Sequence, residues 1–575
     1  MGRNQKTFCT QKFKTLLLTA SVSTGIEYIM LLSDTIIIGN IFGEAAIAAS
    51  NMVVPLFSFV VFVSTLISCG TSALYSYKIG EFKKDEADRL FGQGVLVAVL
   101  SGGVLFLLAT FVENAYFGFM DSSQAVEVYA REYYQYYRFV VLLYPIYAFL
   151  IDMVYADGDE LISNLSYIFQ VGVNIPASVI LCKKIGVGGA SLGTLIGTVL
   201  SMVILLLHFL RKQNSMKFVP HISAKDMVCV ARHGLLDSSI YLFWGIAFFV
   251  ANRFVIARFG AYYLPILSVI VSVIEMTIVF DGVGQAMTPL VTVYRGEKNT
   301  TGIRKVMRLA GKAAALEGVA ASFLLFFFGK YAARLLGVTD PAMQELCATA
   351  IRFVCPFLIC SSVLFLLTSY YLLMEKHTLA LLITAVKDCF TVVCLMVLGG
   401  VLFGLNGVWA GLGLAPLFSA AMTYGIVCAR YGRGIFPLLL PKGEYEIEDF
   451  DLLLTEQNIM KLRDAVEKVL RKKQIDPRTI SRIMLLTEEL EMLVMSKNPG
   501  RKIMAECTLM IGADIQLIFR DNGVLFDITD EDSAISSMRS YVVARMMIYQ
   551  KRKRHLVTTS YNRNVFHFDK EKGDV

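Results

Sequence analysis

Long apolar stretches alternate with short polar loops over the first 441 residues of the chain. A helix needs about 20 apolar residues to span a membrane, and these stretches reach or exceed that length. The pattern predicts about twelve membrane-spanning helices. They lie near residues 13–41, 48–78, 89–112, 136–155, 161–182, 188–210, 228–258, 263–293, 308–329, 348–373, 378–403 and 406–430. The expected fold is therefore an all-α polytopic membrane protein.

The membrane region contains an internal repeat. Three sets of motifs begin again 217 or 218 residues later in the chain. They are residues 34–43 with 252–260, residues 71–81 with 288–297, and Gly186, Gly189 and Gly193 with Gly404, Gly407 and Gly411. The repeat predicts two pseudo-symmetric six-helix lobes, residues 1–215 and 216–441. Two homologous halves around a central cavity are typical of secondary transporters.

Composition and charge agree with a membrane location. Hydrophobic residues make up 55% of the chain, and only 18% of its residues are charged. Lys and Arg gather in the loops near residues 78–89, 211–232 and 295–308. Because cytoplasmic loops are enriched in Lys and Arg, we expect a multi-pass protein of the inner (plasma) membrane with both termini in the cytosol.

The same charge distribution argues against other partners. We interpret the net charge of +7 as mostly this loop pattern, and we expect no nucleic-acid partner. The eleven cysteines are scattered without zinc or disulfide spacing, so we expect no metal site. The expected partners are the lipid bilayer and small organic substrates.

Residues 442–575, called the tail below, have a charged and mixed composition and are long enough for a small α/β sandwich domain. Asp476 followed by Pro477 predicts a helix start. Strands are expected near 503–511 and 514–520, and a helix near 534–550. A closing hairpin is expected near 555–568.

Several motifs of the membrane region resemble those of the multidrug and toxic compound extrusion (MATE) transporters over roughly residues 8–437. They are residues 34–43, Tyr77 to Glu81, Asp157-Gly-Asp159, Asn174 and the Gly-rich start of the sixth helix. The resemblance implies a twelve-helix fold of two lobes. It also implies export of organic, often cationic compounds in exchange for Na⁺ or H⁺. In the family, the acid that matches Asp34 couples transport to the cation.

The residue chemistry of the first lobe points the same way. An ionisable side chain inside a membrane is costly, and it usually has a function there. Glu27 and Asp34 are two helical turns apart and share one helix face, which suits a Na⁺ or H⁺ site. Asn174 is a candidate hydrogen-bonding partner. The alternative is that Asp34 and Asn174 only brace contacts between helices.

The second lobe offers Asp237, Glu275 and Asp388 as candidate transport residues, and Glu275 is the best placed of them. Lys387 adjoins Asp388, so a structural ion pair is an equal alternative. Some family members carry a further acid deep in the seventh helix, where this chain has Phe243 and Trp244, and another in the tenth, where it has none. A second-lobe cation site of that type is therefore in doubt.

Two stretches of the tail resemble the ATP-binding fold of GHKL proteins, in the branch of the anti-sigma-factor serine kinases. Glu488 and Glu489 match the helix that carries the Mg²⁺ ligand, and Asp521, Asn522 and Gly523 match the loop that holds adenine. These five residues form a candidate, degenerate nucleotide site. An alternative is that Asp521 to Gly523 form only a type I′ turn.

The departures from the GHKL pattern predict a tail without catalysis. Leu493 stands where the family has the Asn that ligates Mg²⁺, which needs oxygen ligands. Residues 536–540 read Ser-Ser-Met-Arg-Ser, without the glycines whose backbone amides would hold phosphates. We therefore expect no catalytic residues, no cofactor and no use of ATP. A regulatory tail that binds a cytosolic protein is the expected alternative.

The leading prediction is thus a cation-coupled exporter and not an enzyme. One alternative is a flippase for lipid-linked saccharides from the same superfamily, but the charges inside the membrane are mostly acidic, which favours cations. Another is a membrane sensor with the tail as its output. A carboxylate stripe serves Na⁺ or H⁺ equally well.

Overall fold

The computed structural model describes residues 7–80, 83–120, 123–211, 214–441, 443, 445–524, 553–554 and 561–569. The chain divides into two compact units. One unit contains Ser21–Asp281 and Ala314–Ala429, and the other contains Met1–Ala20, Gly282–Ala313 and Arg430–Val575. The boundaries predicted for the two lobes and the tail remain predictions.

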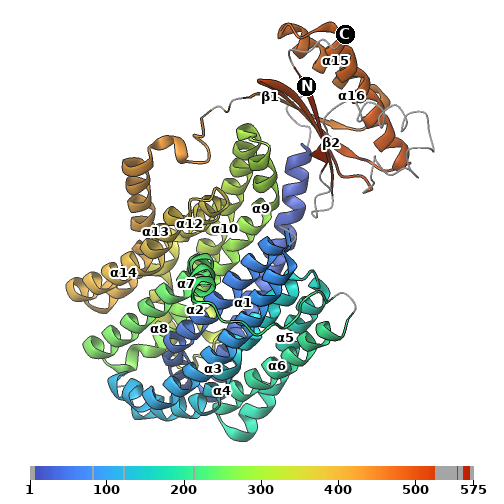
Figure 1. Cartoon of the computed structure of the whole chain (residues 1–575). Helices are drawn as coiled ribbons and strands as arrows, with labels where there is room; N and C mark the ends of the chain where they lie inside the picture. The colour runs from blue at the N-terminus through green and yellow to red at the C-terminus, as the bar shows by residue number, and fades with distance from the viewer. Residues whose placement is uncertain are drawn as a thin grey trace. The chain divides into compact units, whose positions relative to one another are not determined.

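Long helices make up the region before the tail (Figure 1). They are α1 (Phe8–Phe42), α2 (Glu44–Gly80), α3 (Lys84–Met120), α4 (Gln124–Ala156), α5 (Glu160–Ile185), α6 (Gly188–Leu206), α7 (Ala224–Phe259), α8 (Leu264–Glu275), α9 (Asp281–Gly296), α10 (Thr300–Leu335), α11 (Pro341–Val354), α12 (Leu358–Leu373), α13 (His377–Ala385) and α14 (Thr391–Tyr431). The apolar stretches of the sequence thus lie in helices, because a helix satisfies its own backbone hydrogen bonds inside a membrane.

The predicted number of membrane-spanning helices is not confirmed by the structure. Among the described residues, ten helices are long and apolar enough to cross a membrane. The last of them, His377–Tyr431, covers two predicted helices, which meet at a kink where Gly404 has a φ of 67°. In α1, the apolar part that the structure describes is the shorter segment Leu32–Phe42. The prediction of twelve spans therefore stays a prediction.

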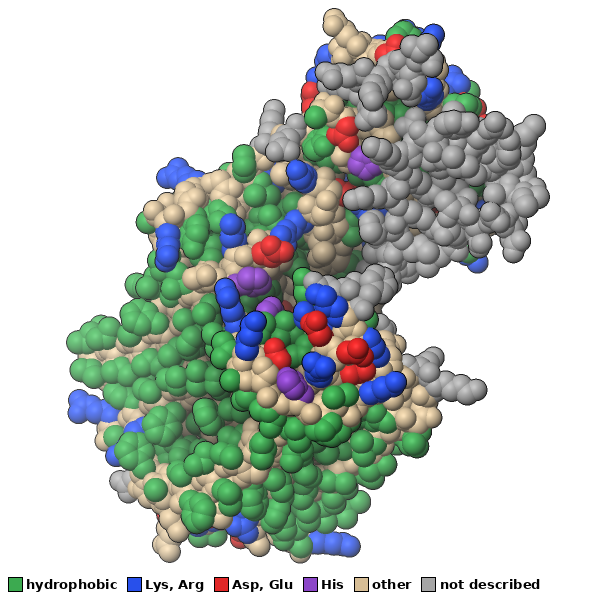
Figure 2. Space-filling model, viewed as in Figure 1, with side chains coloured by type: hydrophobic (Ala, Val, Ile, Leu, Met, Phe, Trp, Pro, Cys, Tyr) green, Lys and Arg blue, Asp and Glu red, His purple; other side chains and the backbone are tan. Residues whose placement is uncertain are grey.

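The surface of the long helices is apolar, as a lipid-facing surface must be. Hydrophobic side chains cover most of the helical surface visible in Figure 2. Phe111, Phe403 and Leu402 are among the large apolar side chains that are most exposed, at 80%, 75% and 68%. Apolar surface of this extent marks contact with lipid or protein. The chain is accordingly a multi-pass membrane protein.

The tail forms a two-layer α/β domain. Its antiparallel sheet has the order β1-β2-β3-β5-β4, and α15 and α16 lie side by side over it (Figure 1). The elements are β1 (Glu446–Leu453), α15 (Glu456–Lys472), α16 (Pro477–Lys497), β2 (Met504–Ile511), β3 (Asp514–Asp521), β4 (Lys553–Arg554) and β5 (Asn562–Asp569). Leu462, Ile483, Leu509, Leu517 and Phe566 are buried in the core between the layers. Such a core lets the domain fold around one hydrophobic centre.

Several local predictions for the tail are confirmed. Asp476 begins α16 by accepting the backbone N–H groups of Arg478 and Thr479 at 3.0 and 3.1 Å. The two central strands lie where the alternating pattern placed them. The predicted helix near 534–550 lies outside the described residues. Of the predicted closing hairpin, the structure describes β4 and β5, which pair antiparallel.

Two features of the tail differ from the predictions. The sequence analysis missed β1 and α15. The alternative prediction of a type I′ turn at residues 521–523 is wrong. Such a turn requires a positive φ at both central residues, and neither Asn522 nor Gly523 has one.

Glu491 of α16 gives the tail a pH-dependent stability. Its side chain is 2% exposed, and neither carboxyl oxygen has a hydrogen-bond partner among the described residues. Burial and then the charge of Asp521 raise the pKa of Glu491 well above its ordinary value. A carboxyl group with a raised pKa in the folded state stabilises the fold below its unfolded pKa, and this stability is lost as the pH rises through the folded pKa.

We therefore expect Glu491→Gln to stabilise the tail at pH 8 and to have little effect at pH 4. The free energy of unfolding should rise by about 1.4 kcal/mol for each unit by which the pKa of Glu491 in the folded state exceeds its pKa in the unfolded state. Only units below the pH of the measurement count. Hydrogen exchange of α16 and β2 in the purified full chain measures it. Glu448→Gln, at an exposed position of β1, is the matched control. An equal effect of Glu491→Gln at both pH values would refute this assignment.

Candidate transport site

Asp34 in α1 lies at the centre of a polar contact between three helices. Its Oδ2 accepts a hydrogen bond from the hydroxyl of Thr194 in α6 at 3.0 Å. The same hydroxyl accepts from Nδ2 of Asn174 in α5 at 2.8 Å. A hydroxyl can accept from an amide while it donates to a carboxylate, so the three side chains form one chain of hydrogen bonds. The structure thus brings Asp34 and Asn174 together through Thr194.

The sequence analysis missed Thr194, whose position depends on how closely α5 and α6 approach. Gly193 and Gly197 of α6 face α5, and a Cβ atom on either would collide with Ser178 or with the backbone of Gln170. Small residues four apart lie on one helix face and allow such close packing in membranes. The signal for Thr194 was therefore the neighbouring glycines rather than the threonine itself.

The other carboxylate oxygen of Asp34 has no such partner. Oδ1 is buried and makes no hydrogen bond of ordinary geometry with a described residue, although the Asn174 side chain lies close to the Asp34 carboxylate. A buried acceptor that is left unpaired costs about 1–3 kcal/mol, and more when it is charged. A proton or a Na⁺ ion on this oxygen would remove that cost. The chemistry of this arrangement therefore suits a proton or a Na⁺ ion.

Glu27 shares α1 with Asp34, but its side chain lies outside the described set. Its neighbours in α1 contact the second half of the chain. The Tyr28 hydroxyl donates to the Ser272 carbonyl oxygen in α8 at 2.9 Å, and Thr24 donates to the Val279 carbonyl oxygen at 3.4 Å. A joint site of Glu27 and Asp34 thus stays a prediction.

Two acids of the second half lie in the region that this part of α1 contacts. Glu275 ends α8, where the helix changes into a 3₁₀ turn, Met276–Phe280. Glu317 of α10, which the sequence analysis missed, accepts from the Ser21 hydroxyl at 3.4 Å, and its Oε2 is buried without a partner among the described residues. The signal for Glu317 was a lone acid within the predicted helix 308–329.

Asp388 pairs with Lys387, the ion pair named above as the alternative. The Lys387 ammonium lies 2.7 and 2.6 Å from the two oxygens of Asp388 and 4.0 Å from the centre of the Phe365 ring. Both residues belong to a π-helical turn, Val386–Phe390. They line a cavity of about 70 Å³, which has room for two or so waters and not for a drug-sized molecule. A transport role for Asp388 stays a prediction.

Asp237 occupies an exposed position in α7. Its transport role also stays a prediction.

The two halves of the chain meet again at the far end of α1. The Glu44 carboxylate, at the start of α2, accepts the backbone N–H groups of Thr339 and Asp340 at 2.7 and 3.0 Å. It also accepts from the Thr339 hydroxyl at 3.1 Å. These donors precede α11, whose first N–H groups have no partner within the helix. Glu44 therefore forms a polar contact, called the Glu44 latch below, between elements of the first and the second predicted lobe.

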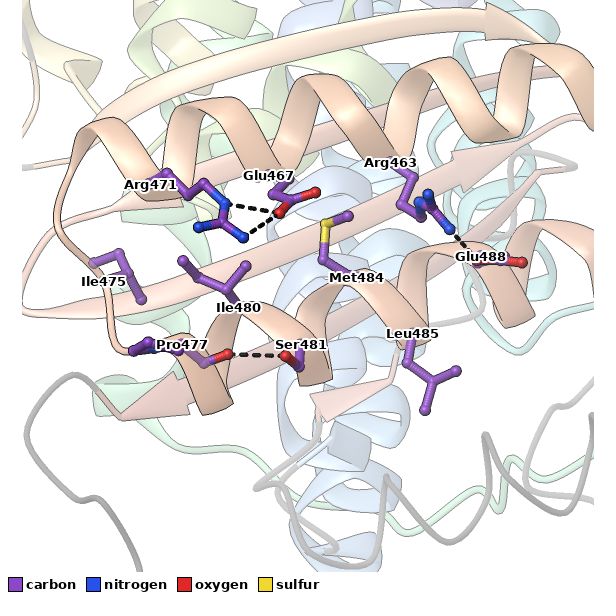
Figure 3. Close-up of a pocket in the computed structure, with 10 residues that line it drawn as sticks. All are labelled: Arg463, Glu467, Arg471, Ile475, Pro477, Ile480, Ser481, Met484, Leu485 and Glu488. Carbon is purple, nitrogen blue, oxygen red and sulfur yellow. Dashed lines mark hydrogen bonds and ion pairs between the residues drawn. The ribbon is translucent and has the colours of Figure 1, made fainter.

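The tail carries an open groove of about 540 Å³ between α15 and α16 (Figure 3). Arg471 and Glu467 pair across one turn at 2.7 Å, and Arg463 of α15 reaches Glu488 of α16 at 3.2 Å. Glu488 is the one nucleotide-site candidate among the described residues that line this groove. The Glu488 carboxylate is already paired with the Arg463 guanidinium at the surface of the tail.

The other nucleotide-site candidates do not share that groove. Asp521 is buried at the end of β3, where Oδ1 accepts from the Gly523 N–H at 2.9 Å and from Nδ2 of Asn562 at 2.8 Å. Burial raises the pKa of Asp521 to about 6, against these two hydrogen bonds. Asn522 bonds to the backbone of Met504. The Asp521 to Gly523 segment thus makes hydrogen bonds within the tail itself, and Glu489 lies on α16, outside it.

Comparisons with known proteins place the helical region of the chain in a family. The MatE family model matches residues 20–180 and 240–399, more than half of the chain. Multidrug export protein MepA from Staphylococcus haemolyticus (strain JCSC1435) is 20% identical over 403 residues, which is 69% of this chain and 88% of that protein.

Two solved structures are similar in fold. One is an inward-facing multidrug resistance MATE family transporter of the MOP superfamily, with a TM-score of 0.65, 19% identity and coverage of 72% of this chain and 97% of that one. The other is the MATE multidrug transporter DinF-BH, solved as a complex, with a TM-score of 0.61, 19% identity and coverage of 76% and 100%. The chain therefore belongs to the MatE family, whose members are membrane transporters and not enzymes.

Proposed function

We propose that this protein exports organic, often cationic compounds in exchange for Na⁺ or H⁺, with Asp34 as the residue that binds the coupling ion. The observation that carries the proposal is the buried Oδ1 of Asp34, which makes no hydrogen bond of ordinary geometry with a described residue while Oδ2 is held by Thr194. A buried carboxylate with one unpaired oxygen is stabilised when a cation binds to that oxygen. The names of two relatives, a multidrug export protein and a MATE multidrug transporter, support the substrate class.

Transport then follows by alternating access in the plasma membrane, with both chain ends in the cytosol. The internal repeat supplies two halves that can rock against each other. The Glu44 latch is a contact that would break and re-form in each cycle. Glu317 and Glu275 provide further acids in the region where α1 contacts the second half.

In this proposal the tail regulates transport and does not use ATP. The hydrogen bonds within the Asp521 to Gly523 segment and the Arg463–Glu488 pair support a tail that does not use ATP, because they occupy groups of the candidate nucleotide site.

We expect Asp34→Asn to abolish efflux of a fluorescent organic cation from cells. An amide keeps the size of the side chain but cannot take up a proton or hold Na⁺ by charge. Efflux is measured at equal membrane expression, with Glu345→Gln at an exposed position of α11 as a matched removal of one carboxylate. Wild-type efflux by Asp34→Asn would contradict the proposed role.

Thr194→Val tests the hydroxyl that holds Asp34. The substitution keeps the shape and removes the donor, and a hydrogen bond to a charged group contributes about 1.5–3 kcal/mol. We expect the concentration of Na⁺ or H⁺ that gives half-maximal efflux to change about tenfold or more. Thr194→Ser retains the hydroxyl and should behave as the wild type. Identical cation dependence of the valine and serine variants would rule the contact out of the mechanism.

A further inference from the structure

The face of the tail sheet away from α15 and α16 has an apolar part, around Met510, Ile518 and Val565, and a polar part that is also buried. Side chains alternate along a strand, so Cys507 and Leu509 of β2 reach the core while Glu506 and Thr508 point to the opposite face. Arg520 of β3 lies beside them, 2.9 Å from Glu506 and 3.0 Å from the Thr508 hydroxyl. Arg520 and Glu506 are each 1% exposed. Charged residues are almost never buried to this degree without partners.

The end of α9 and the start of α10, here called the α9–α10 hairpin, supply those partners. The Tyr294 hydroxyl donates to Glu506 at 2.8 Å, and its ring lies 4.7 Å from the guanidinium of Arg520. Glu297 forms an ion pair with Arg520 and accepts from Arg563 of β5 at 2.7 Å.

Lys305 of α10 completes the network. Its ammonium lies 2.9 Å from Asp451 of β1 and 3.2 Å from Glu506. Three cations thus face three carboxylates, which are Lys305, Arg520 and Arg563 with Glu297, Asp451 and Glu506. Removing one member of such a buried set leaves another charge uncompensated, which is strongly destabilising.

The start of α1 docks on the same sheet (Figure 1). The backbone N–H of Phe8 donates to Oδ1 of Asp451 at 2.9 Å. The Phe8 ring meets the Tyr561 ring edge-on at 5.6 Å, and the Lys12 ammonium lies 5.5 Å from the centre of that ring. Phe8 and Cys9 are 1% and 0% exposed. Asp451 therefore holds α1 with one carboxyl oxygen and α10 with the other.

We propose that the tail is a brace between the two predicted lobes, because its sheet ties the start of α1 in the first lobe to the α9–α10 hairpin in the second. The docked tail holds these elements in one arrangement and slows the rocking of the lobes. The inference rests on the alternating-access function proposed above. The surface that the tail binds, the start of α1 and the α9–α10 hairpin, belongs to the same chain. Undocking of the tail from this surface accelerates transport.

Lys305→Met and Asp451→Asn, each in the full-length chain, test the brace. Hydrogen exchange of β1, β2 and the end of α9 reports docking without any need for transport. Lys312→Met, an exposed position two turns later in α10, is the matched control. We expect about tenfold faster exchange at the docking face for Lys305→Met and Asp451→Asn, with the core of α16 still protected. We also expect a several-fold higher initial rate of organic-cation efflux.

Two results would overturn the proposal. One is unchanged hydrogen exchange of β1, β2 and the end of α9 in both variants, which would show that these charges do not hold the tail in place. The other is faster exchange with unchanged or slower efflux, which would show that the docked tail does not slow transport. Absence of efflux from the wild type would instead overturn the proposed export function, while the exchange measurement would still decide whether the tail docks through these charges.

Discussion

The position of Asp34, with one oxygen held by Thr194 and the other buried without a hydrogen bond of ordinary geometry to a described residue, is the constraint on which the transport account depends. A membrane interior offers no water to meet that oxygen, so its cost must be met by the protein or by an ion. The close packing of α5 against α6 holds Thr194 and Asn174 in place, but adds no such hydrogen bond to Oδ1. A site that is incomplete without a cation is suited to a transporter that must bind and release one.

Charges buried beneath the tail must also be stabilised, but there other charged side chains do so. On the sheet face that contacts the α9–α10 hairpin, three cations pair with three carboxylates, which belong to β1, β2, β3, β5, the end of α9 and the start of α10. Burial of a balanced network gives specificity of docking rather than large stability, because desolvation offsets most of the attraction. A contact of that kind is well suited to a brace that opens and closes, since neither state is favoured overwhelmingly.

Much of the fold was predictable because its determinants are local. The length of an apolar stretch decides whether a helix can span a membrane, and the scarcity of charge inside the membrane singled out Asp34. The breaks after Glu275 and at Val386 were not predictable, since no proline or glycine marks them. Strand β1 was missed because Asp449 and Asp451 look like loop residues. They are half-buried on a polar face that Lys305, 146 residues before Asp451 in the chain, helps to neutralise. Contacts at that separation leave no periodic pattern in the sequence.

The most direct test of the account is ion release on substrate binding. Purified wild type and Asp34→Asn would be titrated with a fluorescent organic cation in weakly buffered solution, and the released H⁺ or Na⁺ measured with selective electrodes. The account predicts that the wild type releases about one ion per bound molecule and that Asp34→Asn releases none. Equal release from both proteins would show that the coupling ion does not bind at Asp34.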